Sequence, residues 1–180
     1  MEKINYGAGL TAIEGYLSVE ECHDYIKLSE SMGYELASIQ TPQGPKFIQD
    51  VRNNDRITFD DQALAAALFE RAQPFLPGTL NEWSLLGLNE RFRFYRYTPG
   101  QYFKWHKDGF FCRTDNEVSL LSFLIYLNDG YEGGNTEFQW EIVKPKIGMV
   151  LFFPHAMRHQ GAPILSGAKY VLRSDVMYRR

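Results

Sequence analysis

The sequence predicts a mainly β domain with flanking helices, an α+β arrangement, on three observations. Phe, Tyr and Trp number 13, 11 and 3, and many alternate with Val, Ile and Thr as strand residues do. Helix signals are confined to the first half of the chain. From Arg91 onward, short apolar runs are separated by turn residues, as in a β-sandwich or barrel. We therefore expect one domain over residues 1–180, with a helical part at about 1–80 and a β core at about 91–178.

The first half contains two expected helices. Val19–Ser31 follows a capping box, in which the Ser18 hydroxyl and the Glu21 carboxylate each accept a hydrogen bond from a backbone N–H at the helix start. Asp61–Phe75 is rich in strong helix formers, and Asp60 or Asp61 caps it. Between the helices, a short apolar alternation at Phe47–Val51 predicts a strand followed by an irregular loop.

The second half contains the expected strands of the core. Thr136–Val143 shows the clearest alternation, which predicts a single strand with Thr136, Phe138, Trp140 and Ile142 on its core-facing side. The other strands are expected at Arg91–Tyr97, Ser119–Leu127, Met149–Phe153 and Tyr170–Met177.

Composition argues against nucleic-acid and membrane partners. Lys and Arg total 19 against 22 for Asp and Glu, so the net charge is -3 and no basic excess marks a polyanion-binding surface. No apolar run approaches the roughly 18 residues that a membrane span needs, and the first residues show no leader pattern. Cys22 and Cys112 form no CxxC pair, which suits a reducing compartment. These features predict a cytoplasmic protein and leave its oligomeric state open.

Two histidines and an aspartate stand where a metal site would need them. His106 and Asp108 are two residues apart in WHKDG, so at a strand end both side chains point to the same face. His159 follows the apolar strand MVLFF and its breaker Pro154. Two histidines and one carboxylate form the facial triad of non-haem Fe(II) sites, although zinc hydrolases use the same ligand types. His23 lies in the first expected helix and is expected to be an ordinary helix residue.

Five segments follow one another from about Arg93 to Tyr178. They are YTPGQYFKWHKD (Tyr97–Asp108), IYLND (Ile125–Asp129), GGNTEF (Gly133–Phe138), KPKIGMVLFF (Lys144–Phe153), and HQG with SGAKYVLRSDV (His159–Val176). In content and order this series resembles the iron- and 2-oxoglutarate-dependent dioxygenases of the prolyl 4-hydroxylase group. The N-terminal EGYLSVEECHDYI is similar to the helical entry of the same group.

The resemblance implies a double-stranded β-helix, a cupin-like jelly-roll barrel that holds Fe(II) at its mouth. It implies His106, Asp108 and His159 as both the metal ligands and the catalytic centre. It also implies 2-oxoglutarate as cosubstrate and O2 as oxidant, with release of succinate and CO2, and ascorbate as an accessory reductant. Asp108 favours hydroxylation, because related halogenases lack this carboxylate.

The distal carboxylate of 2-oxoglutarate needs a buried cation as its partner. Lys169 lies ten residues beyond His159, the offset at which the resembled group places its anchoring lysine. Arg173 is the alternative anchor on the same strand face, about 13 Å away at ~3.3 Å per residue. Arg173 is otherwise expected to meet the substrate, or to form an ion pair with Asp175 or with an acid of a neighbouring strand.

Two tyrosines and several loop residues complete the candidates. Tyr126 and Tyr97 match tyrosines near the cosubstrate in the resembled group, and both also fit a buried core. For Tyr97 the alternation does not decide which face of the strand points inward. The remaining candidates are expected in loops around the mouth, either solvated or touching substrate: His155, Arg158, Arg113, Trp105 and Arg52–Arg56.

The leading functional hypothesis is a dioxygenase that hydroxylates an amino acid, a peptidyl residue such as proline, or a small molecule. One alternative is a non-catalytic jelly-roll module that binds a metal or ligand. A second is a zinc or manganese hydrolase with the same triad, which would have no use for Lys169. Fold alone does not fix the substrate.

Overall fold

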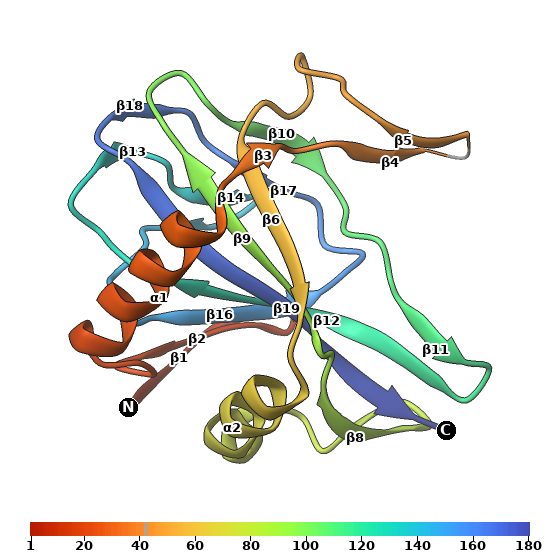
Figure 1. Ribbon diagram of the computed structural model, residues 1–180. Coiled ribbons are helices and arrows are strands. Elements are labelled where there is room, and N and C mark those ends of the chain that lie inside the picture. Colours follow the sequence, from red (N-terminus) through yellow and green to blue (C-terminus); the bar gives the residue numbers. More distant parts are fainter. Residues whose placement is uncertain (42) are drawn as a thin grey trace.

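The computed structural model describes residues 1–41 and 43–180 and has three layers (Figure 1). A large antiparallel sheet lies between the helices on one side and a smaller antiparallel sheet on the other. Helix α1 spans Val19–Met32, helix α2 spans Gln62–Ala72, and the 3-10 helix η1 continues α2 over Gln73–Phe75. Among the described residues, no helix has the length and apolar character that crossing a bilayer requires.

Within the described residues, eleven strands form the large sheet in the order β1-β2-β16-β12-β19-β9-β6-β3, with β11 on β12, β8 on β19 and β7 on β8. Their bounds are β1 Glu2–Gly7, β2 Leu10–Glu14, β3 Glu35–Leu36, β6 Asp55–Asp60, β7 Thr79–Leu80, β8 Trp83–Leu88, β9 Arg91–Tyr97, β11 Cys112–Thr114, β12 Glu117–Tyr126, β16 Val150–Pro154 and β19 Lys169–Arg179. The small sheet contains β10 Phe103–His106, β17 His159–Gly161, β14 Thr136–Phe138 and β15 Ile142–Val143. Two short pairs are β4 Ile39–Thr41 with β5 Gly44–Lys46, and β13 Glu132–Gly133 with β18 Ile164–Ser166.

Both faces of the large sheet are buried. Successive side chains of β9 point alternately to the two faces and pack into two different cores. Phe92 and Phe94 pack into the core under the helices, whereas Tyr95 and Tyr97 pack into the second core, which faces the small sheet. The orientation of Tyr97 is therefore inward, toward the space between the sheets. The prediction of a mainly β, jelly-roll fold is confirmed. Among the described residues no strand pair joins the two sheets, so the fold is an open sandwich and not the closed barrel that was expected.

Both predicted helices are present: α1 begins at Val19 as predicted, and α2 begins at Gln62, one residue after the predicted start at Asp61. Ser18 Oγ accepts the Glu21 N–H at 3.1 Å, and the Glu21 carboxylate accepts the Ser18 N–H at 2.9 Å, so the capping box is complete. Asp61 caps α2 by accepting the Leu64 N–H at 2.9 Å. The helices cover one face of the large sheet (Figure 1) and bury Cys22, Ala65, Leu68 and Ala72 against it.

The N-terminal part is less helical than predicted. Strands β1, β2, β6 and β8 lie before Arg91, and β6 and β8 pair with β9 and β19 in the large sheet. Strand β2 pairs with β16, so that Ile13 lies opposite Val150. These strands depend on partners distant in sequence, which local periodicity does not reveal.

Two strand predictions are wrong in detail. Residues 136–143 form a hairpin, because the Phe138 N–H bonds to the Glu141 carbonyl at 2.7 Å and turns the chain back. The turn pairs Thr136 with Val143, which is buried, and leaves Trp140 and Ile142 exposed. Phe47–Val51 is not a strand either, because the Val51 N–H bonds to the Ile48 carbonyl at 2.9 Å and closes a turn.

A glycine at the entry to β16 gives a stability prediction. Gly148 has φ +74, and a Cβ there would lie 2.2 Å from the Leu17 carbonyl oxygen. We expect Gly148→Ala to lower the free energy of unfolding by at least about 2 kcal/mol, measured by urea denaturation. Gly87→Ala is the control, because Gly87 has open space around it, and a change within about 0.5 kcal/mol is expected. Equal losses in the two variants would contradict the backbone argument.

Candidate active site

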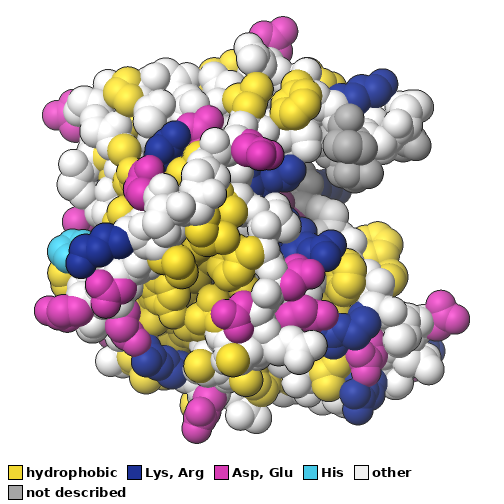
Figure 2. Space-filling model, viewed as in Figure 1, with side chains coloured by type: hydrophobic (Ala, Val, Ile, Leu, Met, Phe, Trp, Pro, Cys, Tyr) yellow, Lys and Arg dark blue, Asp and Glu magenta, His cyan; other side chains and the backbone are white. Residues whose placement is uncertain are grey.

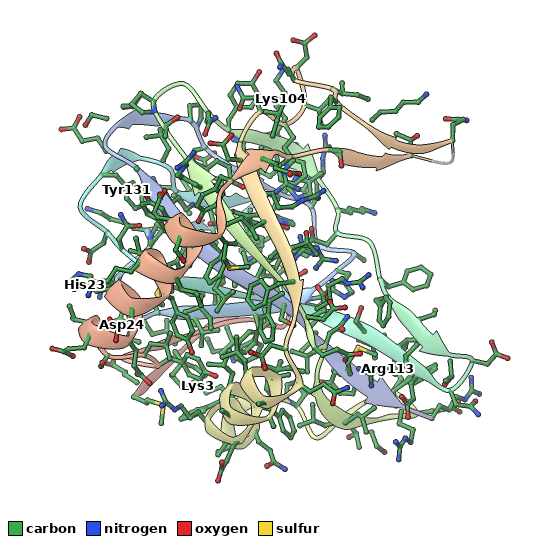
Figure 3. All side chains as sticks on the ribbon, in the orientation of Figure 1. Lys3, His23, Asp24, Lys104, Arg113 and Tyr131 are labelled. Carbon is green, nitrogen blue, oxygen red and sulfur yellow. The ribbon has the colours of Figure 1, made fainter. Side chains whose placement is uncertain are left out.

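Strand pairing in the small sheet brings the two candidate histidines together. His106 ends β10 and His159 begins β17, and they are direct partners in the antiparallel register, with ring centroids 4.2 Å apart. Asp108 follows two residues after His106 and turns back to the same point. One ligand atom from each of the three residues lies within 4.8 Å of the other two. His23 is distant from this group and projects from the outer side of α1 (Figure 3).

The hydrogen bonds of both imidazoles leave their Nε2 atoms as lone-pair donors. His106 Nδ1 lies 2.7 Å from the Lys104 carbonyl oxygen, and His159 Nδ1 lies 3.0 Å from that of Met157. A carbonyl only accepts, so each Nδ1 carries the proton. The two Nε2 atoms then face the Asp108 carboxylate at 3.5 and 3.7 Å. Three converging lone-pair donors of this kind fit a divalent metal ion.

The electrostatics of the site keep the Asp108 carboxylate ionised and the His159 imidazole neutral. Burial alone would raise the pKa of Asp108, but the Arg173 guanidinium and the two histidines outweigh burial and hold it well below its usual range. Burial lowers the pKa of His159 to about 4, against an opposing effect of Asp108. At neutral pH Asp108 and His159 thus have the protonation states that metal ligation requires.

A buried chain of hydrogen bonds holds the Asp108 carboxylate in place. Ser122 donates to Asp108 Oδ2, and Ser122 Oγ lies 2.9 Å from His155 Nδ1. His155 Nε2 lies 2.9 Å from Ser119 Oγ, which accepts the Phe111 N–H at 2.8 Å. His155 lies in the turn after β16, in agreement with the expected loop position, but it is buried and supports the site, so the expectation of a solvated residue is wrong. Burial lowers its pKa, which favours the neutral imidazole that this chain needs.

Arg173 is buried beside the triad. Its Nη1 donates to Asp108 Oδ1 at 2.8 Å, and its Nη2 lies 3.4 Å from Asp175 Oδ1. Strand β19 places Lys169, Val171 and Arg173 on the same face, with Lys169 toward the other end of the space between the sheets. Arg173 therefore supports the metal-ligating carboxylate and forms the ion pair with Asp175 as well.

A narrow pocket leads from the triad to Lys169. Its walls include Tyr95, Tyr97, Tyr126, Leu124, Thr136 and Val171. Lys169 is 4% exposed, donates to the Gly134 carbonyl at 2.6 Å, and has no carboxylate partner among the described residues. Tyr126 and Thr136 hydroxyls lie 2.6 Å apart next to it. A buried ammonium without a counter-charge fits the distal carboxylate of a keto diacid.

The other loop candidates lie at varied distances from the triad. Trp105 is part of β10, with the Arg158 guanidinium 6.0 Å from its ring centroid. Arg113 lies on β11 (Figure 3) and pairs with Glu90 and Glu117, away from the triad. Arg52 is buried and Arg56 is half-buried on β6, and both line a cleft next to His106. Sequence reasoning did not identify Ser119 or Ser122, although Ser122 shares a strand face with Tyr126.

The fold and the site together define the class of this protein. A jelly-roll sandwich that brings two imidazoles and one carboxylate to a single point, with open space beside them, has the architecture of a non-haem iron oxygenase.

Comparison with known proteins gives the family. Residues 92–174, slightly less than half of the chain, match the family model described as the 2OG-Fe(II) oxygenase superfamily. The protein is accordingly a dioxygenase that uses Fe(II), 2-oxoglutarate and O2. A search of curated proteins gave no match.

Solved structures similar to this chain share its fold. A viral collagen prolyl hydroxylase from Paramecium bursaria Chlorella virus-1, a complex with 2-oxoglutarate, has a TM-score of 0.65 at 24% identity, covering 97% of this chain and 98% of its own. A Pseudomonas putida prolyl-4-hydroxylase has a TM-score of 0.66 at 19% identity, with 96% and 93% covered. A Trichoplax adhaerens prolyl hydroxylase, in complex with a fragment of the hypoxia-inducible factor, has a TM-score of 0.70 at 15% identity, with 94% and 83% covered.

Proposed function

We propose that this dioxygenase hydroxylates an amino-acid, peptidyl or small-molecule substrate, with peptidyl proline as the first substrate to test. His106, Asp108 and His159 hold the iron. The observation that carries the proposal is a single pocket lined both by His106 and His159, which converge with Asp108, and by the buried Lys169, whose ammonium has no carboxylate partner among the described residues. When bound, iron and 2-oxoglutarate supply the oxidising chemistry, with succinate and CO2 as the products besides the hydroxylated substrate.

The residues of this chain position and shield that chemistry. The Lys104 and Met157 carbonyls hold each imidazole with its Nε2 toward the metal position. Ser122 and Arg173 hold the Asp108 carboxylate ionised and oriented. Lys169 pairs with the distal carboxylate of the cosubstrate, and the Tyr126 hydroxyl lies beside it.

Further features support the finer points of the proposal. The bound fragment in the Trichoplax relative makes peptides worth testing here. Cys22 and Cys112 are free thiols, which agrees with a cytoplasmic, reducing location. Strands from both ends of the chain share the large sheet, which agrees with a single domain over residues 1–180.

A turnover assay tests the proposed function. Purified protein with Fe(II), ascorbate and 2-oxoglutarate is incubated with amino acids, proline-containing peptides and cell extract, and we expect succinate release with a product heavier by one oxygen atom. Anaerobic addition of 2-oxoglutarate to the ferrous protein is expected to produce a weak visible absorption band from chelation. Activity that is indifferent to 2-oxoglutarate would indicate a hydrolase. Absence of both the band and succinate would indicate a binding module.

A further inference from the structure

A second, larger cleft of about 650 Å³ opens next to the triad and is lined by six Lys and Arg side chains. It meets the narrow pocket at Tyr95, Phe103, His106 and Arg173, which line both. Asp108 is the acid among the described residues of its lining. Figure 2 shows a hollow on the right of the molecule with Lys and Arg side chains at its edge. The cations that line the cleft are Arg52, Arg56, Arg91, Arg93, Lys107 and Arg173.

The register of the large sheet assembles most of these arginines. Arg93 lies opposite Arg173 on β19 and opposite Thr58 on β6, and Arg56 lies opposite Tyr95. Residues directly opposite one another in an antiparallel pair share a face of the sheet, as do residues two apart on one strand. The face that begins at Lys169 therefore continues past the triad as a row of guanidinium groups leading outward.

The acids near this row do not neutralise it. Asp175 is shared between Arg93 and Arg173, with both contacts at 3.4 Å. Asp60 pairs with Arg91 at 2.9 Å in an exposed position. Within the described residues, no carboxylate lies within ion-pair distance of Arg52 or Arg56.

Arg52 is the most constrained of these cations. It is 5% exposed, and its guanidinium carbon lies 4.4 Å from the Tyr95 ring centroid and 4.5 Å from that of Phe103. Its Nε donates to Asn54 Oδ1 at 2.6 Å, whereas its Nη2 has no hydrogen-bond partner among the described residues. A buried guanidinium without an anionic partner is costly, and a ligand anion would relieve that cost.

The neighbouring groups respond to the same positive potential. Burial alone would raise the pKa of Tyr95, but Arg173, Arg52 and Arg93 outweigh it and lower the pKa to about 8. Burial lowers the pKa of Arg56, and the nearby arginines lower it further. Within the part of the chain that the structure describes, Arg56 donates side-chain hydrogen bonds only to Ser38, to its backbone carbonyl at 3.3 Å and to its hydroxyl at 3.0 Å.

We propose that the substrate is anionic and enters through this cleft, with a carboxylate or phosphate group held by Arg52, Arg56 and Arg93 beside the carbon that is hydroxylated. Guanidinium groups bind both anions through paired, charge-assisted hydrogen bonds. The proposal rests on the proposed function, because it assigns the substrate side of the same site. The overall charge of -3 gives no indication of this local excess of positive charge.

Binding measurements on the anaerobic complex with iron and 2-oxoglutarate test the proposal. The probes are nine-residue peptides with a central proline and flanking Glu, Gln or Lys residues, and inorganic pyrophosphate as a competitor. We expect the Glu peptide or pyrophosphate to bind at least about tenfold more tightly than the Gln peptide, and added salt to weaken this binding. Preference for the Glu peptide identifies a carboxylate substrate, and preference for pyrophosphate identifies a phosphate substrate.

Charge-removal variants locate the binding to the cleft. Arg52→Gln and Arg56→Gln are each expected to weaken binding of the preferred anion by about tenfold or more. Arg71→Gln is the control, because it removes a charge from α2, where Arg71 pairs with Glu21, and less than a twofold change is expected. Equal binding of all probes, or equal effects of the three variants, would overturn the proposal. The visible band of the 2-oxoglutarate complex, recorded on the same samples, separates this outcome from failure of the proposed function, which would abolish the band.

Discussion

Lys169→Met is expected to weaken binding of 2-oxoglutarate by roughly 30- to 4000-fold while iron binding is retained. Truncating one partner of a buried, hydrogen-bonded charge pair costs about 2–5 kcal/mol, and about 1.4 kcal/mol corresponds to a factor of ten. Methionine fills a similar volume without the charge. Titration of the anaerobic iron-loaded protein with 2-oxoglutarate measures the loss, and metal analysis after desalting measures the iron.

The same lysine predicts how cosubstrate binding depends on pH. Burial lowers the pKa of Lys169 to about 7, and 2-oxoglutarate remains a dianion throughout the neutral range. The ammonium proposed to bind it is therefore mostly protonated well below pH 7 and is progressively lost above it, so the dissociation constant is expected to rise by up to about tenfold per pH unit above 7. Lys169→Arg keeps its charge and is the control, with a dissociation constant that changes little between pH 7 and 8.5.

The thermal stability of the metal-free protein distinguishes an anchoring role of Lys169 from a structural role. In the folded protein Lys169 has a lower pKa than in the unfolded chain, so its protonation disfavours folding. Lys169→Met is therefore expected to leave the melting temperature of the metal-free protein unchanged or raised. Equal losses of iron and 2-oxoglutarate binding in the variant would assign the anchoring role to another residue.

The sequence identified the triad because its spacing depends on local geometry. His106 and Asp108 are two residues apart, and His159 directly follows an apolar strand, so one register between β10 and β17 brings all three together. The supports of the triad depend on longer-range pairing. Ser122 reaches Asp108 only because β12 pairs with β16 and β19, which also places His155 beneath it.

The cationic cleft shows a different limit of sequence reasoning. Arg52 was expected in a loop, yet an isolated bridge to Phe103 places it between two aromatic rings. Arg93 and Arg173 are 80 residues apart in the sequence and lie opposite one another in the sheet. Alternation predicts which residues share a strand face, but neighbours across strands follow from a register that no local pattern specifies.

Asp108→Asn is expected to lower iron affinity by more than about 100-fold and to reduce succinate release below detection. Mutating a residue that only hydrogen-bonds to a metal ligand already costs up to about 100-fold in metal affinity, so loss of the ligand itself should cost more. The amide keeps the shape of the carboxylate and can still accept from Arg173, but it lacks the charge that balances a divalent ion. A retained shape matters, because complete removal of the side chain would leave the buried Arg173 without its 2.8 Å partner and would itself destabilise the fold by about 3–5 kcal/mol.

Asp175→Asn is the matched control for this substitution. Asp175 is buried and contacts the same guanidinium, at 3.4 Å, but it is not one of the three converging ligands. Both variants therefore remove one negative charge next to Arg173, whereas only Asp108→Asn removes a metal ligand. We expect Asp175→Asn to retain stoichiometric iron, measured by metal analysis on protein whose folding is checked by circular dichroism. A folded Asp108→Asn protein that binds iron as tightly as the unmodified chain would show that the carboxylate is not a ligand, and the metal would then have to be held by other residues.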